Sequence, residues 1–390
     1  MTHPVQYYSP WFRYITANCP DIDLNVVYAI VPTAEQQGAG FSSSFEWDTA
    51  LLDGYRMEVA RESRKDDTLH AGRFFGLNVR EIASAVSARA PDVALIPGWY
   101  SVTLVRAALG CRHIGIPVIC RSDMQLGRAR DTVRTAAWEL KTRVMLRLFT
   151  NFLSVGRRHQ DYLERFGVSR DRIFFSPHCV DNDYFDRSAE AYRSASRREE
   201  ARRQLGIPTG DFVVLYVGKL ESKKRPWDAV AACKALGSGV TLLIVGSGDS
   251  ERRCRDAARD SGVRVVFSGF LNQSELGRAY ALADCLVLPS DYGETWGLVV
   301  NEAMATGLPC VVSDAVGCGP DLIVAGRTGY TYPLGNVPEF SSALDALRSQ
   351  SLGGHSFSAD CRKHIADYSF EKATEGLLAA CRASARFLSA

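Results

Sequence analysis

Two glutamates eight residues apart, Glu294 and Glu302, stand in the segment of the chain that is richest in chemically useful residues. Glu294 follows an apolar run and a glycine turn, whereas Glu302 lies inside an expected helix that ends at the stop signal Gly307 to Pro309. Free amides at the start of that helix favour an anion or a hydroxyl-rich ligand. Because carboxylates accept hydrogen bonds from vicinal hydroxyls, the pair suits two sugar rings of one ligand.

Three earlier segments carry further groups that suit a nucleotide. Gly218 ends an apolar run and is followed by four cations within seven residues, which suits a diphosphate, although a solvated basic loop has the same composition. Gly246 and Gly248 form a second glycine turn, which tight strand-to-helix connections also need for structural reasons alone. Phe270 and Leu271 follow a third run, where the ring could meet a flat base or belong to the protein core.

Short, β-branched apolar runs that end in turn residues must position these groups. Near-continuous apolar runs indicate strands buried on both faces, and their alternation with helix-length segments predicts a parallel sheet. We therefore expect two doubly wound α/β domains, which bind ligands beyond the carboxyl ends of their strands. The expected strands lie in Leu24–Val31, Val93–Gly98, Ile116–Cys120, Phe152–Gly156, Ile173–Ser176, Phe212–Gly218, Thr241–Gly248, Arg264–Gly269, Cys285–Ser290 and Pro309–Ser313.

A polar stretch, Arg187–Gly210, separates the two sets of runs. It has a helix-forming composition, and its charges from Arg197 to Arg203 are typical of a solvated helix face. We place the domain boundary here. The expected organisation is a first domain over residues 1–187, a second over 188–367, and a final helical segment over 368–390 that crosses back to the first domain.

The segment from Gly293 to Pro309 reads G-E-x-W-G-L-x-x-x-E-A-M-A-x-G-x-P. It resembles the signature of the retaining GT-B glycosyltransferases of glycosyltransferase family 4, the glycosyl transferases group 1. The preceding blocks V-G-K-L-x-x-x-K, V-G-x-G and F-x-G-F occur in the order that this family shows, so the resemblance covers about residues 212–335. It implies the GT-B fold, in which two Rossmann-like domains face each other across a cleft.

The resemblance also implies roles. Glu294 would bind hydroxyls of the transferred sugar, and Glu302 would bind the ribose of the nucleotide. Lys219 and Lys224 fall where the family places an Arg and a Lys on the diphosphate, so at Lys219 a point charge replaces a bidentate fork. The catalytic residues expected on this basis are Lys219, Lys224 and Glu294. The expected donor-binding residues are Gly218, Gly246, Gly248, Phe270, Leu271, Thr295, Trp296, Gly297, Leu298 and Glu302.

The first half resembles the family more weakly and would form the acceptor side. The loop with His3 and Gln6 resembles the one after the first strand in some members, and Asp123 ends a strand where many members carry His-Asp near the acceptor. These three are the expected acceptor contacts, although Asp123 suits a helix cap or a turn equally well. Residues 45–55 resemble a segment of one subgroup, and we expect His178 to be structural.

The beginning of the chain departs from the family. The chain starts almost at the loop that follows the family's first strand, which lies in the middle of the sheet in the usual order. Without that strand two ladders of backbone groups lose their partners, and each buried orphan costs about 1–3 kcal/mol. We expect either that the natural product begins several residues upstream, which its intact mass would test, or that this sheet is rearranged.

Composition excludes several other classes. The 46 Lys and Arg against 44 Asp and Glu give a net charge of +2, too small a field to hold nucleic acid. Eleven cysteines without zinc or C-x-x-C spacing suggest buried thiols in a reducing compartment. With neither signal peptide nor spanning segment, we expect a cytoplasmic protein. Arg134–Phe149 predicts a basic amphipathic helix that either packs on the sheet or touches the cytoplasmic face of a membrane.

The function expected from these residues and this resemblance is transfer of a sugar from a nucleotide-diphosphate-sugar to an acceptor hydroxyl, with retention and without a metal or other cofactor. The acceptor would be a glycan, a lipid-linked sugar or a small molecule, in the biosynthesis of a glycan, a glycolipid or a glycosylated metabolite. Alternatives are a non-catalytic sugar-nucleotide-binding subunit, a GT-B phosphorylase or an epimerase. A dinucleotide oxidoreductase is excluded because neither half has G-x-G-x-x-G followed by the acidic residue.

Overall fold

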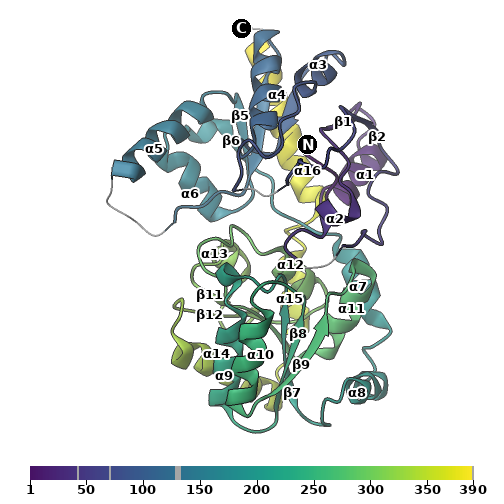
Figure 1. Cartoon of the computed structure of the whole chain (residues 1–390), viewed down its shortest axis with the longest axis vertical. Coiled ribbons are helices and arrows are strands. Elements are labelled where there is room, and N and C mark those ends of the chain that lie inside the picture. Colours follow the sequence, from purple (N-terminus) through teal and green to yellow (C-terminus); the bar gives the residue numbers. More distant parts are fainter. Residues whose placement is uncertain (42–43, 70–71, 128–132, 389–390) are drawn as a thin grey trace. The chain divides into compact units, whose positions relative to one another are not determined.

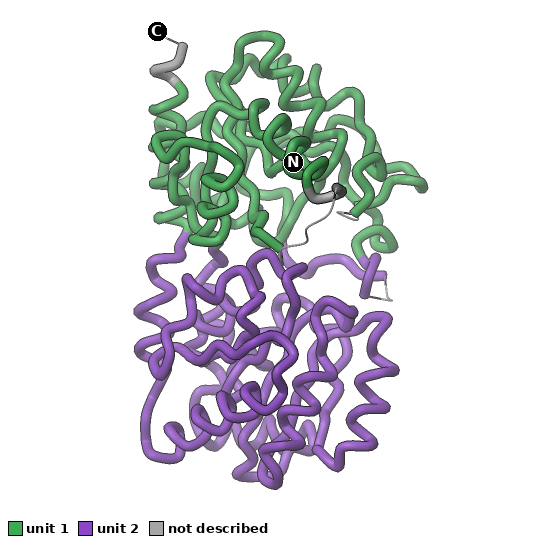
Figure 2. Tube along the Cα trace, turned by 90° about the vertical axis from the view of Figure 1, so that its left-hand side faces the viewer, with its two compact units in different colours: residues 1–37, 50–178, 370–390 green, residues 38–49, 179–369 purple. Residues whose placement is uncertain are grey.

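The computed structural model describes residues 1–41, 44–69, 72–127 and 133–388, with the side chains of 133–135 and 385–388 left aside (Figure 1). The chain divides into two compact units (Figure 2). The first consists of residues 1–37, 50–178 and 370–390, and the second of residues 38–49 and 179–369.

The second unit is built on a six-stranded parallel sheet with the strand order β12-β11-β10-β7-β8-β9. Its order reverses between β7 and β10, which are hydrogen-bonded neighbours, so the carboxyl ends of these two strands define the switch point where doubly wound sheets bind ligands. The strands are β7 (Phe212–Val217), β8 (Val240–Val245), β9 (Arg264–Gly269), β10 (Cys285–Leu288), β11 (Cys310–Ser313) and β12 (Gly329–Tyr332). The helices are α7 (Asn182–Glu190), α8 (Ala195–Gln204), η2 (Ser222–Lys224), α9 (Pro226–Leu236), α10 (Glu251–Ser261), α11 (Gln273–Leu282), α12 (Leu298–Ala305), α13 (Gly319–Leu322), α14 (Val337–Leu352) and α15 (Ser358–Ile365).

The first unit has a four-stranded parallel sheet, β3-β4-β5-β6, and a separate parallel pair, β1-β2. Its strands are β1 (Asn25–Tyr28), β2 (Arg56–Val59), β3 (Ala94–Ile96), β4 (Val118–Ser122), β5 (Asn151–Ser154) and β6 (Ile173–Phe175). Its helices are α1 (Ser9–Asn18), α2 (Ala34–Gln37), α3 (Ile82–Ser87), α4 (Val102–His113), α5 (Val133–Leu146), α6 (Arg157–Arg165), η1 (Arg170–Arg172) and α16 (Phe370–Leu388), the last packed on β5 and β6. Each unit is thus an α/β unit with parallel strands, as the sequence predicts.

All ten predicted apolar runs overlap a strand. Central strands such as β7 and β8 are buried on both faces, whereas the edge strands β6 and β9 are only partly buried. Two strands were not predicted. β2 has the sequence Arg-Met-Glu-Val and is largely exposed, so it contains no apolar run that would predict a strand. It is a strand because its backbone pairs with β1. β12 begins at Gly329 at the edge of its sheet, where an added Cβ would lie 1.7 Å from the Cys310 carbonyl oxygen.

The first two residues of the chain extend the ladder of β1. The Ala29 N–H donates to the Met1 carbonyl at 3.0 Å, and the Ile30 N–H donates to the Thr2 carbonyl at 3.2 Å. The Met1 amino group donates to the Val27 carbonyl at 2.7 Å. The strands described in this unit therefore stand in two separate sheets, with Met1 and Thr2 against the free edge of the smaller one.

The prediction of a solvated helix face in the polar stretch 187–210 holds for Arg197, Glu200 and Arg203 of α8, which are exposed, but not for all of its charges. Arg202 in α8 is only 3% exposed and pairs with Asp284 at 2.9 Å. The guanidinium groups of Arg198 and Arg202 also bind carbonyls at the end of α11, among them that of Leu282 at 2.9 Å. Helix ends leave such carbonyls without partners, so the two arginines dock α8 onto α11.

The boundary between the units falls after residue 178 rather than at the predicted residue 187. The reason is α7, which packs against α11 and α12 and so belongs to the second unit. Residues 38–49 also belong to the second unit, which the sequence did not predict.

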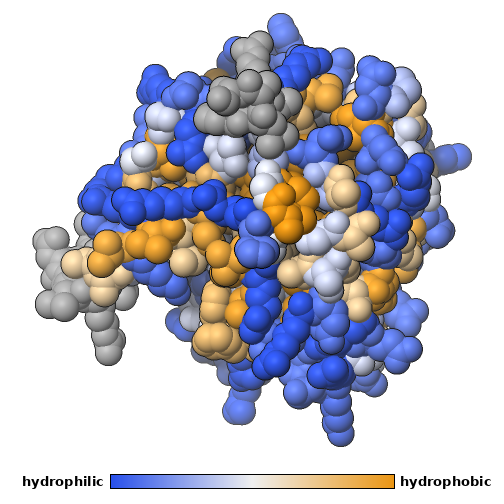
Figure 3. All heavy atoms as spheres, turned by 90° about the horizontal axis from the view of Figure 1, so that it is seen from above, coloured by the Kyte–Doolittle hydropathy of each residue, from blue (hydrophilic) through white to orange (hydrophobic). Residues whose placement is uncertain are grey.

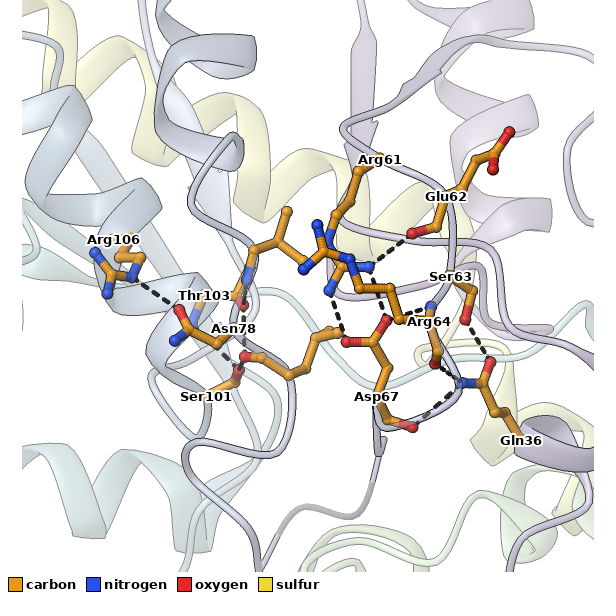
Figure 4. A network of polar contacts seen from close by, with 12 residues as sticks. Gln36, Arg61, Glu62, Ser63, Arg64, Asp67, Asn78, Ser101, Thr103 and Arg106 are labelled. Atoms are coloured by element: carbon orange, nitrogen blue, oxygen red, sulfur yellow. Dashed lines mark hydrogen bonds and ion pairs between the residues drawn. The ribbon is translucent and has the colours of Figure 1, made fainter.

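In the first unit a polar network holds the loop after β2 (Figure 4). Arg61 donates to both carboxylate oxygens of Asp67, at 2.8 and 2.6 Å, and the Arg64 N–H donates to the same carboxylate at 2.8 Å. Gln36, the last residue but one of α2, donates to the Arg64 carbonyl at 2.8 Å. Burial alone would raise the pKa of Asp67, but the bonds from Arg61 and Arg64 outweigh it and hold that pKa below its usual value.

Candidate functional site

Glu294 and Lys224 meet at the switch point of the second sheet. Lys224 ends the short 3₁₀ helix after β7, and Glu294 lies in the loop between β10 and α12. The Lys224 ammonium forms an ion pair with the Glu294 carboxylate, and the two side chains are 14% and 12% exposed. The Ser290 hydroxyl donates to the same carboxylate at 3.2 Å, which fixes the glutamate further. The structure therefore brings together two of the three predicted catalytic residues.

Helix α12 begins directly beyond this pair without a side-chain cap. Its N-cap is Gly297, with φ at 103°, and a Cβ there would lie 2.6 Å from a methyl group of Leu288. Trp296 is 4% exposed and donates from Nε1 to the Asn301 side chain at 2.8 Å, so its ring belongs to the core. The carbonyls of Glu294 and Trp296 accept N–H groups from residues 317 and 318. The predicted contribution of Thr295, Trp296, Gly297 and Leu298 through main-chain amides is compatible with this arrangement and stays a prediction.

Glu302 lies one turn further along α12 and is 1% exposed. The Tyr280 hydroxyl, from α11, donates to its carboxylate. Burial raises the pKa of the nearby Tyr184, and the carboxylates of Asp48, Asp181 and Glu302 raise it further.

Gly246 and Gly248, which the sequence predicts to bind the donor, are also required by the local packing. A Cβ on Gly246, whose φ is 133°, would lie 2.0 Å from the Gly218 carbonyl oxygen, and one on Gly248 would lie 2.7 Å from the Leu220 carbonyl oxygen. The loops after β7 and β8 also share hydrogen bonds, including Leu220 N–H to the Ser247 carbonyl at 2.9 Å. Close packing of two neighbouring loops therefore requires Gly246 and Gly248 whether or not a ligand is present.

Lys219 and Phe270 both contact the segment 38–49. The Lys219 ammonium donates to the Ala39 carbonyl at 3.0 Å and lies 4.5 Å from the centre of the Phe41 ring. Burial lowers the pKa of Lys219, although nearby Glu221 opposes this. The Phe270 ring packs against Phe45 with 4.3 Å between ring centres, and Leu271 beside it is half-buried. Lys219, the third predicted catalytic residue, thus has its main contacts in this segment rather than with Glu294.

In the first unit, Asp123 lies beside a histidine and a buried arginine. The His178 ring is 3.8 Å from the Asp123 carboxylate and 3.5 Å from the Arg121 guanidinium. Arg121 is 3% exposed, donates to the Tyr8 hydroxyl at 2.9 Å and lies over the Trp11 ring. Burial lowers the pKa of His178, Asp123 opposes this, and Arg121 adds to the lowering.

The other two predicted acceptor residues lie before α1. The His3 ring nitrogen Nδ1 shares a hydrogen bond of 3.0 Å with the Thr2 hydroxyl. Burial lowers the pKa of His3 to about 4, and the charged amino terminus contributes less to the lowering. Gln6 lies in the turn that leads into α1 and is half-buried.

Arg121, Tyr8 and His159 were not among the predicted site residues. His159 is 2% exposed and shares a hydrogen bond of 2.9 Å with the Ser122 hydroxyl, and burial lowers its pKa to about 3. The available signal was a charged residue directly after an apolar strand run, since Arg121 follows Ile116–Cys120 and precedes Asp123 by two positions. Its neighbours come from distant parts of the chain and could not be read from local spacing.

Comparison with solved structures identifies the class of fold. A sucrose-phosphate synthase from Thermosynechococcus elongatus matches with a TM-score of 0.72 at 18% identity, over 100% of this chain and 96% of that one. Anabaena Alr3699/HepE in complex with UDP and glucose matches with a TM-score of 0.69 at 17% identity, over 94% of each chain. The chain therefore has the GT-B fold of glycosyltransferases, as expected from the sequence.

Residues 197–364 match the family model for glycosyl transferases group 1. D-inositol 3-phosphate glycosyltransferase from Mycobacterium tuberculosis is 34% identical over 203 residues, which are 50% of this chain and 41% of the relative. Over residues 197–364 the chain matches the glycosyl transferases group 1 family, and the resemblance seen in the sequence is confirmed there. The match spans about two fifths of the length of these curated relatives.

Proposed function

We propose that the chain transfers a sugar from a nucleotide-diphosphate-sugar to a hydroxyl group of an acceptor, with retention of configuration at the anomeric carbon. The observation that carries the proposal is the Lys224–Glu294 ion pair beside the uncapped start of α12, at the switch point between β7 and β10. A cation and free amides suit a diphosphate, and a carboxylate suits sugar hydroxyls. The family match over residues 197–364 and the UDP and glucose complex of a fold neighbour support the same donor class.

In this reaction the bond between the anomeric carbon and the diphosphate oxygen breaks, and a bond to the acceptor oxygen forms on the same face. The proton of the acceptor hydroxyl passes to the departing phosphate, so no side-chain base is assigned. Negative charge grows on the diphosphate, where Lys224, Lys219 and the amides at the start of α12 stabilise it. Glu294 holds the hydroxyls of the transferred sugar and Glu302 those of the ribose.

The proposed reaction uses no metal ion. Within the described part of the chain, no group of three or more His, Cys, Asp or Glu side chains is placed to hold one. Lysine and helix-terminal amides supply the positive charge that a metal provides elsewhere. We expect the transfer rate to be unchanged by EDTA, and loss of activity that Mg²⁺ or Mn²⁺ restores would contradict metal independence.

The acceptor side is proposed to lie in the first unit around Asp123, with His3 and Gln6. Asp123 and His178 provide an acceptor and a donor for the hydroxyls of a glycan, a lipid-linked sugar or a small molecule.

None of the described helices combines the length and apolar character that crossing a membrane requires. Seen from above, hydrophobic residues on the surface of the molecule lie in groups separated by hydrophilic residues (Figure 3). Helix α5 exposes Leu140 and Val144, and we propose it as the place of any peripheral membrane contact.

Replacement of Glu294 tests the proposed function. Glu294→Ala removes the hydroxyl acceptor and leaves Lys224 without its partner, so we expect turnover to fall by about two orders of magnitude or more. Glu190→Ala, a change of a glutamate in α7 whose side chain is 65% exposed and pairs with Arg193, is the control and should leave turnover unchanged. If Glu294→Ala retains full turnover, or if only a partner protein's activity depends on the chain, the chain is a binding subunit instead.

A further inference from the structure

A short segment of the chain lies on the second unit although both flanks belong to the first (Figure 2). We call residues 38–41 and 44–49 the strap. The strap contacts the ends of three neighbouring strands in turn: Ala39 contacts Lys219 after β7, Phe41 contacts Ser247 after β8, and Phe45 contacts Phe270 after β9. It therefore runs along the carboxyl edge of the sheet, where doubly wound domains bind their ligands.

The strap is anchored at the start of α11. The Ser274 N–H donates to the Asp48 carboxylate at 3.1 Å, and the Ser274 hydroxyl donates to it as well. The Asn272 side chain donates to the Glu46 carbonyl at 2.7 Å, and the Thr49 hydroxyl donates to the Gln273 side chain at 3.3 Å. Four polar contacts to the start of α11 indicate that the strap binds there in one specific position.

Three aromatic rings of the strap gather around Phe270. The ring centres of Phe45 and Phe41 lie 4.3 and 5.0 Å from that of Phe270, and that of Trp47 lies 6.4 Å away. A planar base between two rings needs them about 7 Å apart, since aromatic carbons stack at about 3.5 Å on each side. At 4.3 Å between ring centres, no base fits between Phe45 and Phe270 while Phe45 is in place.

Lys219 is engaged by the strap in the same way. Its ammonium bonds the Ala39 carbonyl and lies over the Phe41 ring, and a Cβ on Gly40 would come within 2.9 Å of the ammonium nitrogen. Gly40 has φ at 89°, so glycine suits both the conformation and the close approach of the lysine. Phe270 and Lys219, which the sequence predicts to bind the donor, are thus both in contact with the strap.

We propose that the strap is an autoinhibitory cover that a nucleoside diphosphate displaces. The diphosphate would replace the Ala39 carbonyl as the partner of Lys219, and the base would replace Phe45 beside Phe270. The proposal rests on the proposed function, because it assumes that Lys219 and Phe270 serve the donor. In the seated state the strap and the donor compete for the same two groups. Loosening the strap should therefore strengthen binding of the nucleotide.

Calorimetric titration of the full chain with UDP, GDP and ADP tests the competition. Phe45→Ala removes the closest ring from Phe270, and we expect the diphosphate that binds the wild type to bind this variant about tenfold more tightly. Asp48→Ala loosens the anchor without touching the rings and should tighten binding about threefold. Phe75→Ala, a change of a 73% exposed ring in the first unit, is the control and should have no effect.

A second measurement follows the strap itself. Hydrogen exchange of the amides from Phe45 to Thr49 should become faster when the bound nucleotide displaces the strap, and slower exchange would overturn the proposal. Equal or weaker nucleotide binding by Phe45→Ala would also overturn it while leaving the proposed function intact. If neither the wild type nor Phe45→Ala binds any of the three diphosphates, the proposed function fails together with the inference.

Discussion

Among single residues, Gly246 is required by the close packing of the loops that follow β7 and β8. Gly246→Ala would place a Cβ 2.0 Å from the Gly218 carbonyl oxygen, a backbone atom that cannot move without disturbing β7. We expect the free energy of unfolding to fall by at least about 3 kcal/mol, measured by urea denaturation. Gly262→Ala is the control, because its φ of 72° is also positive but its Cβ meets nothing within 4 Å. It should cost about 1 kcal/mol, and equal losses in the two variants would contradict the packing argument.

The buried histidine His159 makes the stability of the first unit depend on pH. Burial lowers its pKa to about 3, whereas in the unfolded chain the pKa is near the ordinary 6.5. Below pH 6.5 the unfolded chain binds a proton that the folded chain does not, so stability is lost as the pH falls from 6.5 toward 3. For this one group the loss between pH 7 and pH 5 is about 2 kcal/mol.

His159→Gln removes this titration and keeps a polar group near the Ser122 hydroxyl. We expect the difference in unfolding free energy between pH 7 and pH 5 to shrink by up to about 2 kcal/mol, measured by urea denaturation at both pH values. The same change at His113, exposed at the end of α4, is the control. An unaltered pH dependence in His159→Gln would show that this histidine does not titrate as its burial implies.

At the scale of elements, the docking of α8 on α11 depends on a nearly buried charge pair. Asp284→Ala removes the closer carboxylate of Arg202, whose side chain is 4% exposed, and leaves only that of Glu199 at 3.6 Å. Removing one partner of a buried pair costs about 3–5 kcal/mol, so we expect a loss near the lower figure. Glu200→Ala breaks the exposed pair with Arg203 and should change stability by less than about 1 kcal/mol. Similar thermal unfolding midpoints for the two variants would refute the docking role.

The elements also show how far the sequence could predict this molecule. Ten strands were predictable because each overlaps a short, largely apolar run, whereas β2 is held by pairing with β1 and has no such run. The Glu294 to Glu302 region was predictable because its groups are contiguous in the sequence. The strap was not, since Phe45 and Phe270 meet only through the fold. The burial of Arg202 in α8 was not predictable for the same reason, because its carbonyl partner Leu282 lies on another helix.

At the scale of the whole molecule, the chain combines a well-matched second unit with a first unit that resembles the family less. The eleven cysteines are all free, and all but Cys19 and Cys381 are buried, as the sequence predicts for structural thiols. The second unit carries the Lys224–Glu294 pair, the start of α12 and Glu302 around the ends of β7 and β10. We propose that this unit binds a nucleotide-diphosphate-sugar and releases its nucleoside diphosphate.

Release of UDP, GDP or ADP from a panel of UDP-, GDP- and ADP-sugars tests this claim most directly, because it does not require knowledge of the acceptor. We predict that the full chain releases nucleoside diphosphate from at least one donor, by slow hydrolysis, and that Glu294→Ala reduces the rate by about two orders of magnitude. Absence of both binding and release for every donor would contradict the claim. So would equal rates for the wild type and Glu294→Ala.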